Sequence, residues 1–294
     1  MAIYVDDLMI FSNNEARKNK LKQQLSSHFQ MKDLGTAKQC LGIRIQRTTV
    51  GITLDQEEYI ESTLKRFNMN ECNPVTILIM NASEKLSTEM CPKTEAEADL
   101  MKDVPYQEAV GCLMYLAQST RPDILFAINT LSRFNRNPGP KHWNAVKHVL
   151  RYLRGTSTYK LEFKRNAESC KKQPTVALST CGAEYMAVSS AIQEASGWRG
   201  ISALFGSNQP IELRCDNQSC IAIAKNGGYN PRTKHIDIRH HYIRDSLEQG
   251  VVNLKYISTE DQIADGLTKP LQKIKLGKNR RSMGITTASG GVLK

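Results

Sequence analysis

Two adjacent aspartates, Asp6 and Asp7, lie between two short apolar runs near the beginning of the chain. Residues 3–5 (Ile-Tyr-Val) precede the pair, and residues 8–11 (Leu-Met-Ile-Phe) follow it. This pattern predicts two short strands joined by a turn that carries both carboxylates. Neighbouring carboxylates repel each other unless a cation screens them, so we expect a hairpin tip able to hold a divalent cation. The alternative is an ordinary solvent-exposed turn, which is the more common outcome for an isolated Asp-Asp pair.

The chain is basic, and its positive charge is concentrated at the C-terminal end. At 294 residues it is long enough for two or three domains, and its formal net charge of +11 predicts a polyanionic partner such as nucleic acid. No acidic residue follows Asp265, and we interpret residues 276–294 as a basic tail, with a merely solvated tail as the alternative. The basic residues after Asp265 are Lys269, Lys273, Lys275, Lys278, Arg280, Arg281 and Lys294.

The cysteines and the apolar runs indicate the compartment. The chain has eight cysteines and no Cys-x-x-Cys pair, and Cys215 and Cys220 have no second pair with which to form a zinc site. We therefore expect a reduced intracellular protein, in the cytoplasm or nucleus, that is not secreted. No apolar run approaches the roughly 18 residues of a membrane span, and no signal peptide precedes the first strand. Because only two residues precede that strand, we also expect a missing N-terminal part.

Apolar periodicity divides the chain into segments. Residues 73–105 are polar, acidic and punctuated by proline, which predicts a linker. Before it we expect helices at 15–29 and 56–67 and strands at 41–45 and 52–54. After it we expect helices at 107–118, 122–134 and 141–154, a strand at 161–163, strands at 175–178, 211–215 and 251–257, helices at 182–205 and 219–225, and a last helix starting near Asp261.

Strings of residues along the chain resemble the Pol polyprotein of copia-type retrotransposons, and they occur in that family's order. Those that resemble reverse transcriptase are 4–7 (Tyr-Val-Asp-Asp), 31–35 (Met-Lys-Asp-Leu-Gly) and 41–45 (Leu-Gly-Ile-Arg-Ile). Those that resemble the connection region are 110–117, 120–124 (Thr-Arg-Pro-Asp-Ile) and 150–156. Those that resemble ribonuclease H are 171–180, 183–187 (Ala-Glu-Tyr-Met-Ala), 215–219 (Cys-Asp-Asn-Gln-Ser), 232–238 and 263–271.

The resemblance covers roughly residues 1–275 and implies an α+β architecture. It divides the chain into the end of a reverse-transcriptase palm with a thumb-like segment (1–72), the linker (73–105), a helical connection region (106–163) and a ribonuclease H-like α/β domain (164–275). The implied functions are RNA-directed DNA synthesis and degradation of RNA in RNA–DNA hybrids. Both use two-metal phosphoryl transfer with Mg²⁺, or Mn²⁺ in its place, and no small-molecule cofactor.

The resemblance assigns catalytic and metal-binding roles to five carboxylates. These are Asp6, Asp7, Glu184, Asp216 and Asp265. Taken singly, Glu184 is also explained as a first-turn helix carboxylate, Asp216 as a helix N-cap ahead of Ser219, and Asp265 as a surface acid.

A basic, histidine-rich stretch between residues 232 and 244 is a candidate for nucleic-acid contact. A solvated helix face explains this stretch equally well, and a metal site explains it less well, because no cysteine spacing accompanies the histidines. The residues proposed to contact nucleic acid are Arg232, Lys234, His235, Arg239 and Arg244.

Two departures from the family pattern point to an inactive fragment. Family polymerases carry a third catalytic aspartate, the nucleotide pocket and the fingers before the Tyr-Val-Asp-Asp hairpin, and this sequence has none of them. The family also has several tens of residues, including Ser-Asp-Ala-Asp-Trp-Ala, where this chain has only residues 164–170. That stretch supplies the first ribonuclease H strand and its first metal-binding aspartate. The alternatives are a catalytically dead nucleic-acid-binding remnant retained by the host, and a pseudogene product that does not fold.

Overall fold

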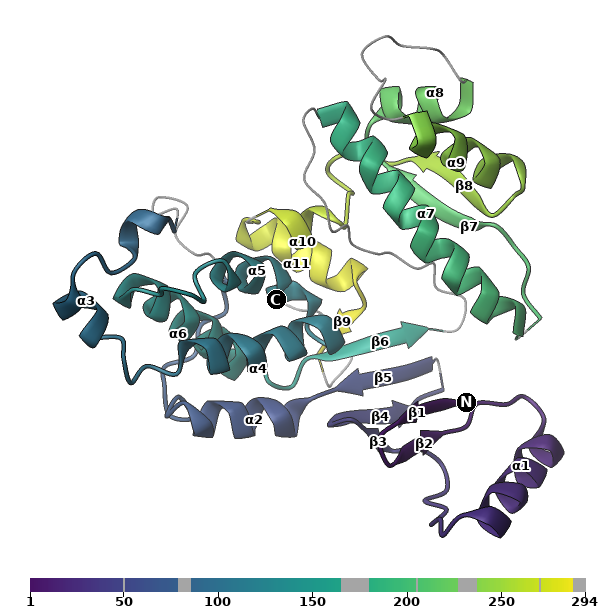
Figure 1. The fold of residues 1–294 in the computed structure, drawn as a ribbon, viewed down its shortest axis with the longest axis horizontal. Helices are drawn as coiled ribbons and strands as arrows, with labels where there is room; N and C mark the ends of the chain where they lie inside the picture. The colour runs from purple at the N-terminus through teal and green to yellow at the C-terminus, as the bar shows by residue number, and fades with distance from the viewer. Residues whose placement is uncertain are drawn as a thin grey trace. The chain divides into compact units, whose positions relative to one another are not determined.

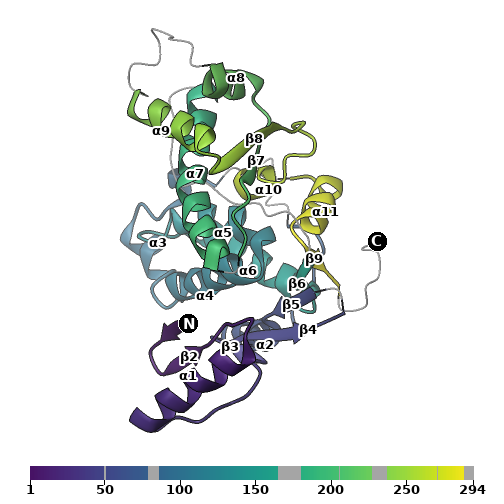
Figure 2. The ribbon, with the colours of Figure 1, turned by 90° about the vertical axis from the view of Figure 1, so that its right-hand side faces the viewer.

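The computed structural model describes residues 1–49, 51–78, 86–164, 180–204, 206–226, 237–269 and 271–287 (Figures 1 and 2). The chain forms two compact units. Unit 1 contains Met1–Ala167 together with Gly266–Lys294, and unit 2 contains Glu168–Asp265. The chain therefore leaves unit 1, builds unit 2 and returns to unit 1. These boundaries differ from the sequence-based segments, which kept residues 164–275 together and divided residues 1–163 into three parts.

The N-terminal hairpin forms as predicted. Strands β1 (Ala2–Tyr4) and β2 (Asp7–Met9) are antiparallel, with Tyr4 opposite Asp7. Helix α1 (Glu15–His28) follows, and the side chain of its N-cap Asn14 accepts a hydrogen bond from the backbone N–H of Arg17 at 3.0 Å. The helix was predicted from its apolar face, yet none of its residues is buried.

An antiparallel sheet of five strands forms one side of unit 1 (Figure 1). Its order is β3-β4-β5-β6-β9. Gly51 must remain a glycine, because a Cβ atom there would lie 1.9 Å from the carbonyl oxygen of Phe163 on the neighbouring strand. The strands are β3 (Gln39–Cys40), β4 (Ile43–Arg47), β5 (Gly51–Asp55), β6 (Lys160–Lys164) and β9 (Ile285–Thr286). The predicted strands near residues 43, 52 and 161 are therefore confirmed.

Helices bury the main core of unit 1. Ile60, Leu113 and Leu150, from three different helices, are each at most 1% exposed. The helices are α2 (Glu57–Arg66), α4 (Tyr106–Ser119), the 3-10 turn η2 (Pro122–Ile124), α5 (Leu125–Ser132) and α6 (Pro140–Gly155). The helices predicted at 56–67, 107–118 and 141–154 are confirmed, whereas the single helix predicted at 122–134 is divided into η2 and α5. The predicted linker is partly structured, because it contains the short helices η1 (Thr88–Met90) and α3 (Glu95–Asp99).

The C-terminal segment folds onto unit 1, so the expectation of a tail from residue 276 is wrong over residues 276–287. Helices α10 (Asp265–Thr268) and α11 (Lys273–Ser282) lead into β9, which pairs with β6 so that Ile285 lies opposite Leu161 (Figure 2). Leu276 and Ile285 are 7% and 0% exposed. Burial of these apolar side chains outweighs the solvation that the surrounding lysines favour.

The described part of unit 2 contains a pair of parallel strands. Strands β7 (Ile211–Cys215) and β8 (Val252–Tyr256) pair in register, from Ile211 opposite Val252 onward. The described helices of this unit are α7 (Thr180–Leu204), α8 (Gln218–Asn226) and α9 (Asp237–Glu248). Its core includes Ile192, Cys220, Ile243 and Leu254. The predicted strand at 175–178 lies outside the described residues. No helix in the described part of the chain is long and apolar enough to cross a membrane.

Candidate functional site

The Asp-Asp pair lies at the exposed end of the β1–β2 hairpin. Asp6 is in the turn and Asp7 is the first residue of β2, and both residues are solvent-exposed. Val5 precedes them with φ of 48°. A β-branched residue is rarely found in this left-handed region, and such a conformation costs on the order of 1–3 kcal/mol. The turn that presents the carboxylates is therefore strained.

The carboxylates of the hairpin match a hard divalent cation in ligand type but supply only part of its shell. Mg²⁺ and Mn²⁺ prefer oxygen ligands, and Mg²⁺ sites commonly use one or two carboxylates together with waters and substrate phosphates. Within the described residues, no group of three or more histidine, cysteine, aspartate or glutamate side chains is placed to hold a metal. Sharing of a cation by Asp6 and Asp7 remains a prediction.

The three carboxylates assigned to ribonuclease H occupy different elements around unit 2. Glu184 lies near the start of α7, and its side chain is outside the described part of the chain. Asp216 directly follows β7 and is half-buried. Asp265 begins α10 and is 6% exposed, so the interpretation of Asp265 as a surface acid is wrong. Convergence of these three side chains on one site remains a prediction.

The capping alternative for Asp216 is also wrong, because its neighbour Asn217 has that role. Oδ1 of Asn217 accepts a hydrogen bond from the backbone N–H of Cys220 at 3.0 Å, which caps the start of α8. The backbone N–H of Asn217 also contacts Sγ of Cys215 at 3.4 Å. Asp216 therefore does not cap α8.

Of the predicted nucleic-acid contacts, only Arg244 has a described side chain. Arg232, Lys234 and His235 lie outside the described residues, and Arg239 is described only as part of the backbone of α9. Arg244 lies on the same helix with its side chain 40% exposed, and it forms an ion pair with Glu248 at 3.8 Å. Such an exposed pair contributes little to stability.

A buried polar network in unit 1 was not predicted. Arg121 and Asp123 are both 0% exposed in their side chains and form a two-bond pair, with Nε–Oδ1 at 3.0 Å and Nη2–Oδ2 at 2.9 Å. The hydroxyl of Tyr152 donates to Oδ2 of Asp123 at 2.6 Å. Arg121 also donates to the carbonyl of Thr156 at 2.9 Å. One indication of this network was visible in the sequence, because Arg121 and Asp123 are charged residues within the mostly apolar stretch 113–131.

The C-terminal helix completes this network. Arg280 of α11 is 9% exposed, and its Nη1 donates to the hydroxyl of Tyr152 at 3.0 Å. The guanidinium carbons of Arg121 and Arg280 each lie 5.4 Å from the ring centroid of Tyr159, a cation–π distance. Burial alone would raise the pKa of Asp123, but the charge of Arg121 and the hydrogen bonds hold this pKa below its usual value. The guanidinium of Arg121 therefore bonds this carboxylate directly, and that of Arg280 is linked to it through the hydroxyl of Tyr152.

Comparisons with known proteins give consistent matches. Residues 1–81 match the family model described as reverse transcriptase (RNA-dependent DNA polymerase). The chain is 40% identical over 317 residues to the retrovirus-related Pol polyprotein from transposon TNT 1-94 of Nicotiana tabacum, and 31% identical over 335 residues to that from transposon RE2 of Arabidopsis thaliana. These alignments cover 95% and 100% of this chain. No solved structure matches the chain.

The lengths of these alignments carry further information. The chain spans only 24% and 22% of the two relatives, or about a quarter of their length. In the tobacco alignment, 95% of 294 residues is about 279 residues, whereas 317 positions are aligned. About 38 positions of that alignment therefore have no counterpart in this chain.

Proposed function

The chain belongs to the family of retrovirus-related Pol polyproteins from copia-type transposons, and we propose that it is a reverse transcriptase–ribonuclease H fragment that binds nucleic acid without catalysing its chemistry. The observation that carries this proposal is that the alignment with a Pol polyprotein covers the whole chain. The net charge of +11 of this chain is the second support, because nucleic acid is a polyanion. RNA–DNA hybrid is the proposed ligand, because RNA-directed DNA synthesis produces it and ribonuclease H degrades its RNA strand.

We expect no polymerase activity from the two carboxylates of the hairpin. In the ancestral reaction, bound Mg²⁺ would stabilise the charge that develops on the transferred phosphoryl group. Asp6 and Asp7 would hold that ion from an exposed turn. Within the described residues, no third histidine, cysteine, aspartate or glutamate side chain joins them to form a metal site, so we expect the hairpin to supply only part of a two-ion site.

The same reasoning applies to the ribonuclease H part. The parallel β7–β8 pair with its three helices supports a ribonuclease H-like unit 2. The alignment with the tobacco relative contains about 38 positions that this chain lacks. This number supports the proposal that several tens of residues are deleted between residues 163 and 171. Glu184, Asp216 and Asp265 would then be one ligand short of a site for two ions.

Exposed cations of α11 supply the proposed contact with phosphates. Lys273, Lys278 and Arg281 are exposed on this helix, whereas Arg280 is buried in the network of unit 1. A helix presents its cations at fixed positions, unlike a tail. Deleting the C-terminal segment would remove both the charges and part of the fold, so point substitutions are the sharper test.

The experiment is a titration of a labelled RNA–DNA hybrid at about 50 and 200 mM salt. Release of counterions predicts at least about tenfold weaker binding at the higher salt concentration if several phosphates are contacted. The variant K273Q/K278Q/R281Q should weaken binding clearly more than the control K20Q/K65Q/K102Q, which removes three exposed charges from elsewhere in unit 1. Binding that is insensitive to salt would contradict the proposal.

The catalytic half of the proposal has its own tests. With Mg²⁺ or Mn²⁺ present, we expect no cleavage of the hybrid and no primer extension on a poly-A template. Robust cleavage that disappears in Asp216→Asn would show instead that unit 2 is a working nuclease. In that case Glu162 or Glu168 would have replaced the missing ligand.

The cysteines support an intracellular location as part of this proposal. All six cysteines whose side chains are described are free thiols, and two of them, Cys215 and Cys220, are buried. Free thiols persist in the reducing cytoplasm and nucleus.

A further inference from the structure

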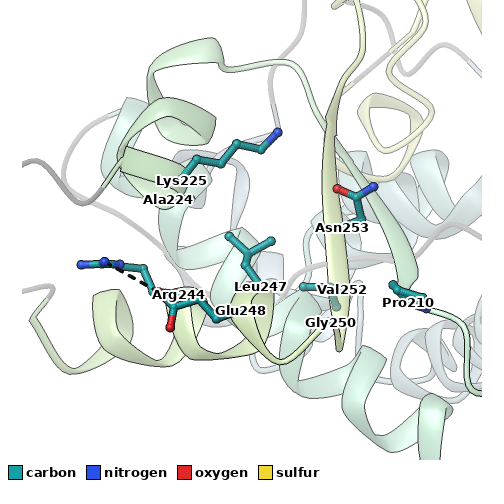
Figure 3. A pocket seen from close by; sticks show the side chains of 9 residues that line it. All are labelled: Pro210, Ala224, Lys225, Arg244, Leu247, Glu248, Gly250, Val252 and Asn253. Carbon is teal, nitrogen blue, oxygen red and sulfur yellow. Dashed lines mark ion pairs between the residues drawn. The ribbon is translucent and has the colours of Figure 1, made fainter.

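A pocket of about 420 Å³ opens on unit 2, at the end of the sheet where β7 and β8 begin (Figure 3). Its size lies within the range of small-molecule sites. Ala224 of α8, Leu247 of α9 and Val252 of β8 give it an apolar lining, and Ala224 and Val252 are at most 2% exposed. Leu247 is half-buried and is therefore the apolar side chain in this lining that a ligand can contact.

Two polar residues also line the pocket. In Figure 3 the side chain of Lys225 extends across the space above Leu247, and the amide of Asn253 borders the same space from β8. Among the described residues, no ion pair engages Lys225. Arg244, by contrast, points away from the pocket centre and is paired with Glu248. Lys225 is therefore the cation available to a ligand, and Asn253 supplies both a donor and an acceptor.

This pocket is distinct from the predicted carboxylate site. Pro210 lines the pocket just before β7, and Asp216 follows the other end of that strand. Six residues of extended chain span roughly 20 Å. A ligand in the pocket therefore does not contact Asp216.

We propose that this pocket binds one nucleotide, with its phosphate on Lys225 and its base against Leu247 beside the amide of Asn253. The inference rests on the proposed function, since it names a specific contact for a chain that binds nucleic acid. The nucleotide is either free or the phosphorylated end of a strand. Both share the same chemistry, a phosphate ester joined to a planar base.

The test measures binding of adenosine monophosphate to the full chain by calorimetry, with adenosine and inorganic phosphate as partial ligands. We expect each partial ligand to bind at least about tenfold more weakly than the nucleotide. Lys225→Met should weaken nucleotide binding about tenfold or more, as loss of a charge-assisted hydrogen bond does. The control Lys255→Met removes the same charge from an exposed position of β8, where Lys255 pairs with Glu212, and should change binding less than twofold.

Asn253→Leu gives a second, independent readout. It should weaken nucleotide binding while leaving the weaker binding of inorganic phosphate unchanged, because the amide contacts the base. Equal weakening by Lys225→Met and Lys255→Met, or no nucleotide binding at about 10 mM ligand, would overturn the proposal. Circular dichroism of each variant confirms that it folds.

A competition arm separates the two sources of the ligand. A short oligonucleotide with a 5′-phosphate that displaces adenosine monophosphate assigns the pocket to a strand end, and failure to displace it assigns the pocket to free nucleotide. Failure of the proposed function gives a different result. Hybrid binding would then be absent or insensitive to salt while the pocket still binds the free nucleotide.

Discussion

Replacing Asp123 by asparagine should strongly destabilise unit 1. The carboxylate is fully buried, is paired with Arg121, and lies close enough to Arg280 for the charge of Arg280 to lower its pKa. Asparagine keeps the shape of the side chain but leaves the buried guanidinium of Arg121 without its counterion. Removing one partner of a buried ion pair costs about 3–5 kcal/mol. With a urea dependence of about 2–3 kcal/mol per molar, the unfolding midpoint should fall by about 1–2.5 M.

The chain carries a natural reporter for each unit. Of its two tryptophans, Trp143 packs against the helical core of unit 1, and Trp198 lies in α7 of unit 2. In a Trp198→Phe background, fluorescence during urea unfolding follows unit 1 alone. Asp103→Asn is the matched control, because Asp103 is exposed and its replacement should change the free energy of unfolding by less than about 0.5 kcal/mol.

A double variant tests whether the loss comes from the unpaired charge. Arg121→Met combined with Asp123→Asn should cost much less than the sum of the two single changes, because it removes charge as well as pairing. The lowered pKa of Asp123 also predicts that its stabilising contribution is present above the unfolded-state value of 3.8 and is lost as the pH falls through the folded-state value. A loss under 1 kcal/mol for Asp123→Asn, or strict additivity in the double variant, would refute this reasoning.

Three further predictions concern local features of unit 1. Val5→Asn should raise the population of the N-terminal hairpin, measured by cross-strand NMR contacts, because asparagine tolerates the positive φ of 48°; unchanged contacts would exclude strain at this turn. Burial lowers the pKa of His142, so the free energy of unfolding should fall as the pH drops below about 6.5, where the unfolded chain binds the proton; His142→Asn should flatten this dependence in urea titrations. Gly284→Ala should lower the melting temperature, because φ is +81° and the new Cβ would lie 2.6 Å from the carbonyl oxygen of Glu162. Gly277→Ala, inside α11 with no atom closer than 3.9 Å to the added Cβ, should instead raise it.

Local periodicity predicted the elements whose partners are close in sequence. The spacing of Ile60, Leu64 and Phe67 predicted both α2 and its buried face. The Asp-Asp pattern predicted the hairpin at residues 2–9, because alternation and turn chemistry act within a few residues. These features depend on short-range physics that a single sequence displays.

The sequence did not reveal contacts between distant residues. Strand β9 has only two residues, too few for any periodicity, and its place in the sheet depends on pairing with Leu161. Arg280 lies in a basic run typical of a solvated tail, and only the distant Tyr152 and Tyr159 give it a buried partner. Likewise, Asp216 and Asn217 are both good cap residues, so local preference alone cannot decide which of them caps α8.

The return of the chain to unit 1 sets an order for folding during synthesis. The ribosome completes unit 2 at Asp265, about 20 residues before it makes Ile285, which closes the sheet of unit 1. Pairing of Leu161 with Ile285 must close a loop of about 120 residues, and a folded unit 2 shortens the flexible part of that loop and so lowers its entropic cost. A stop codon after Thr268 would leave unit 2 intact but would remove Arg280 and β9, so the sheet and buried network of unit 1 would stay incomplete.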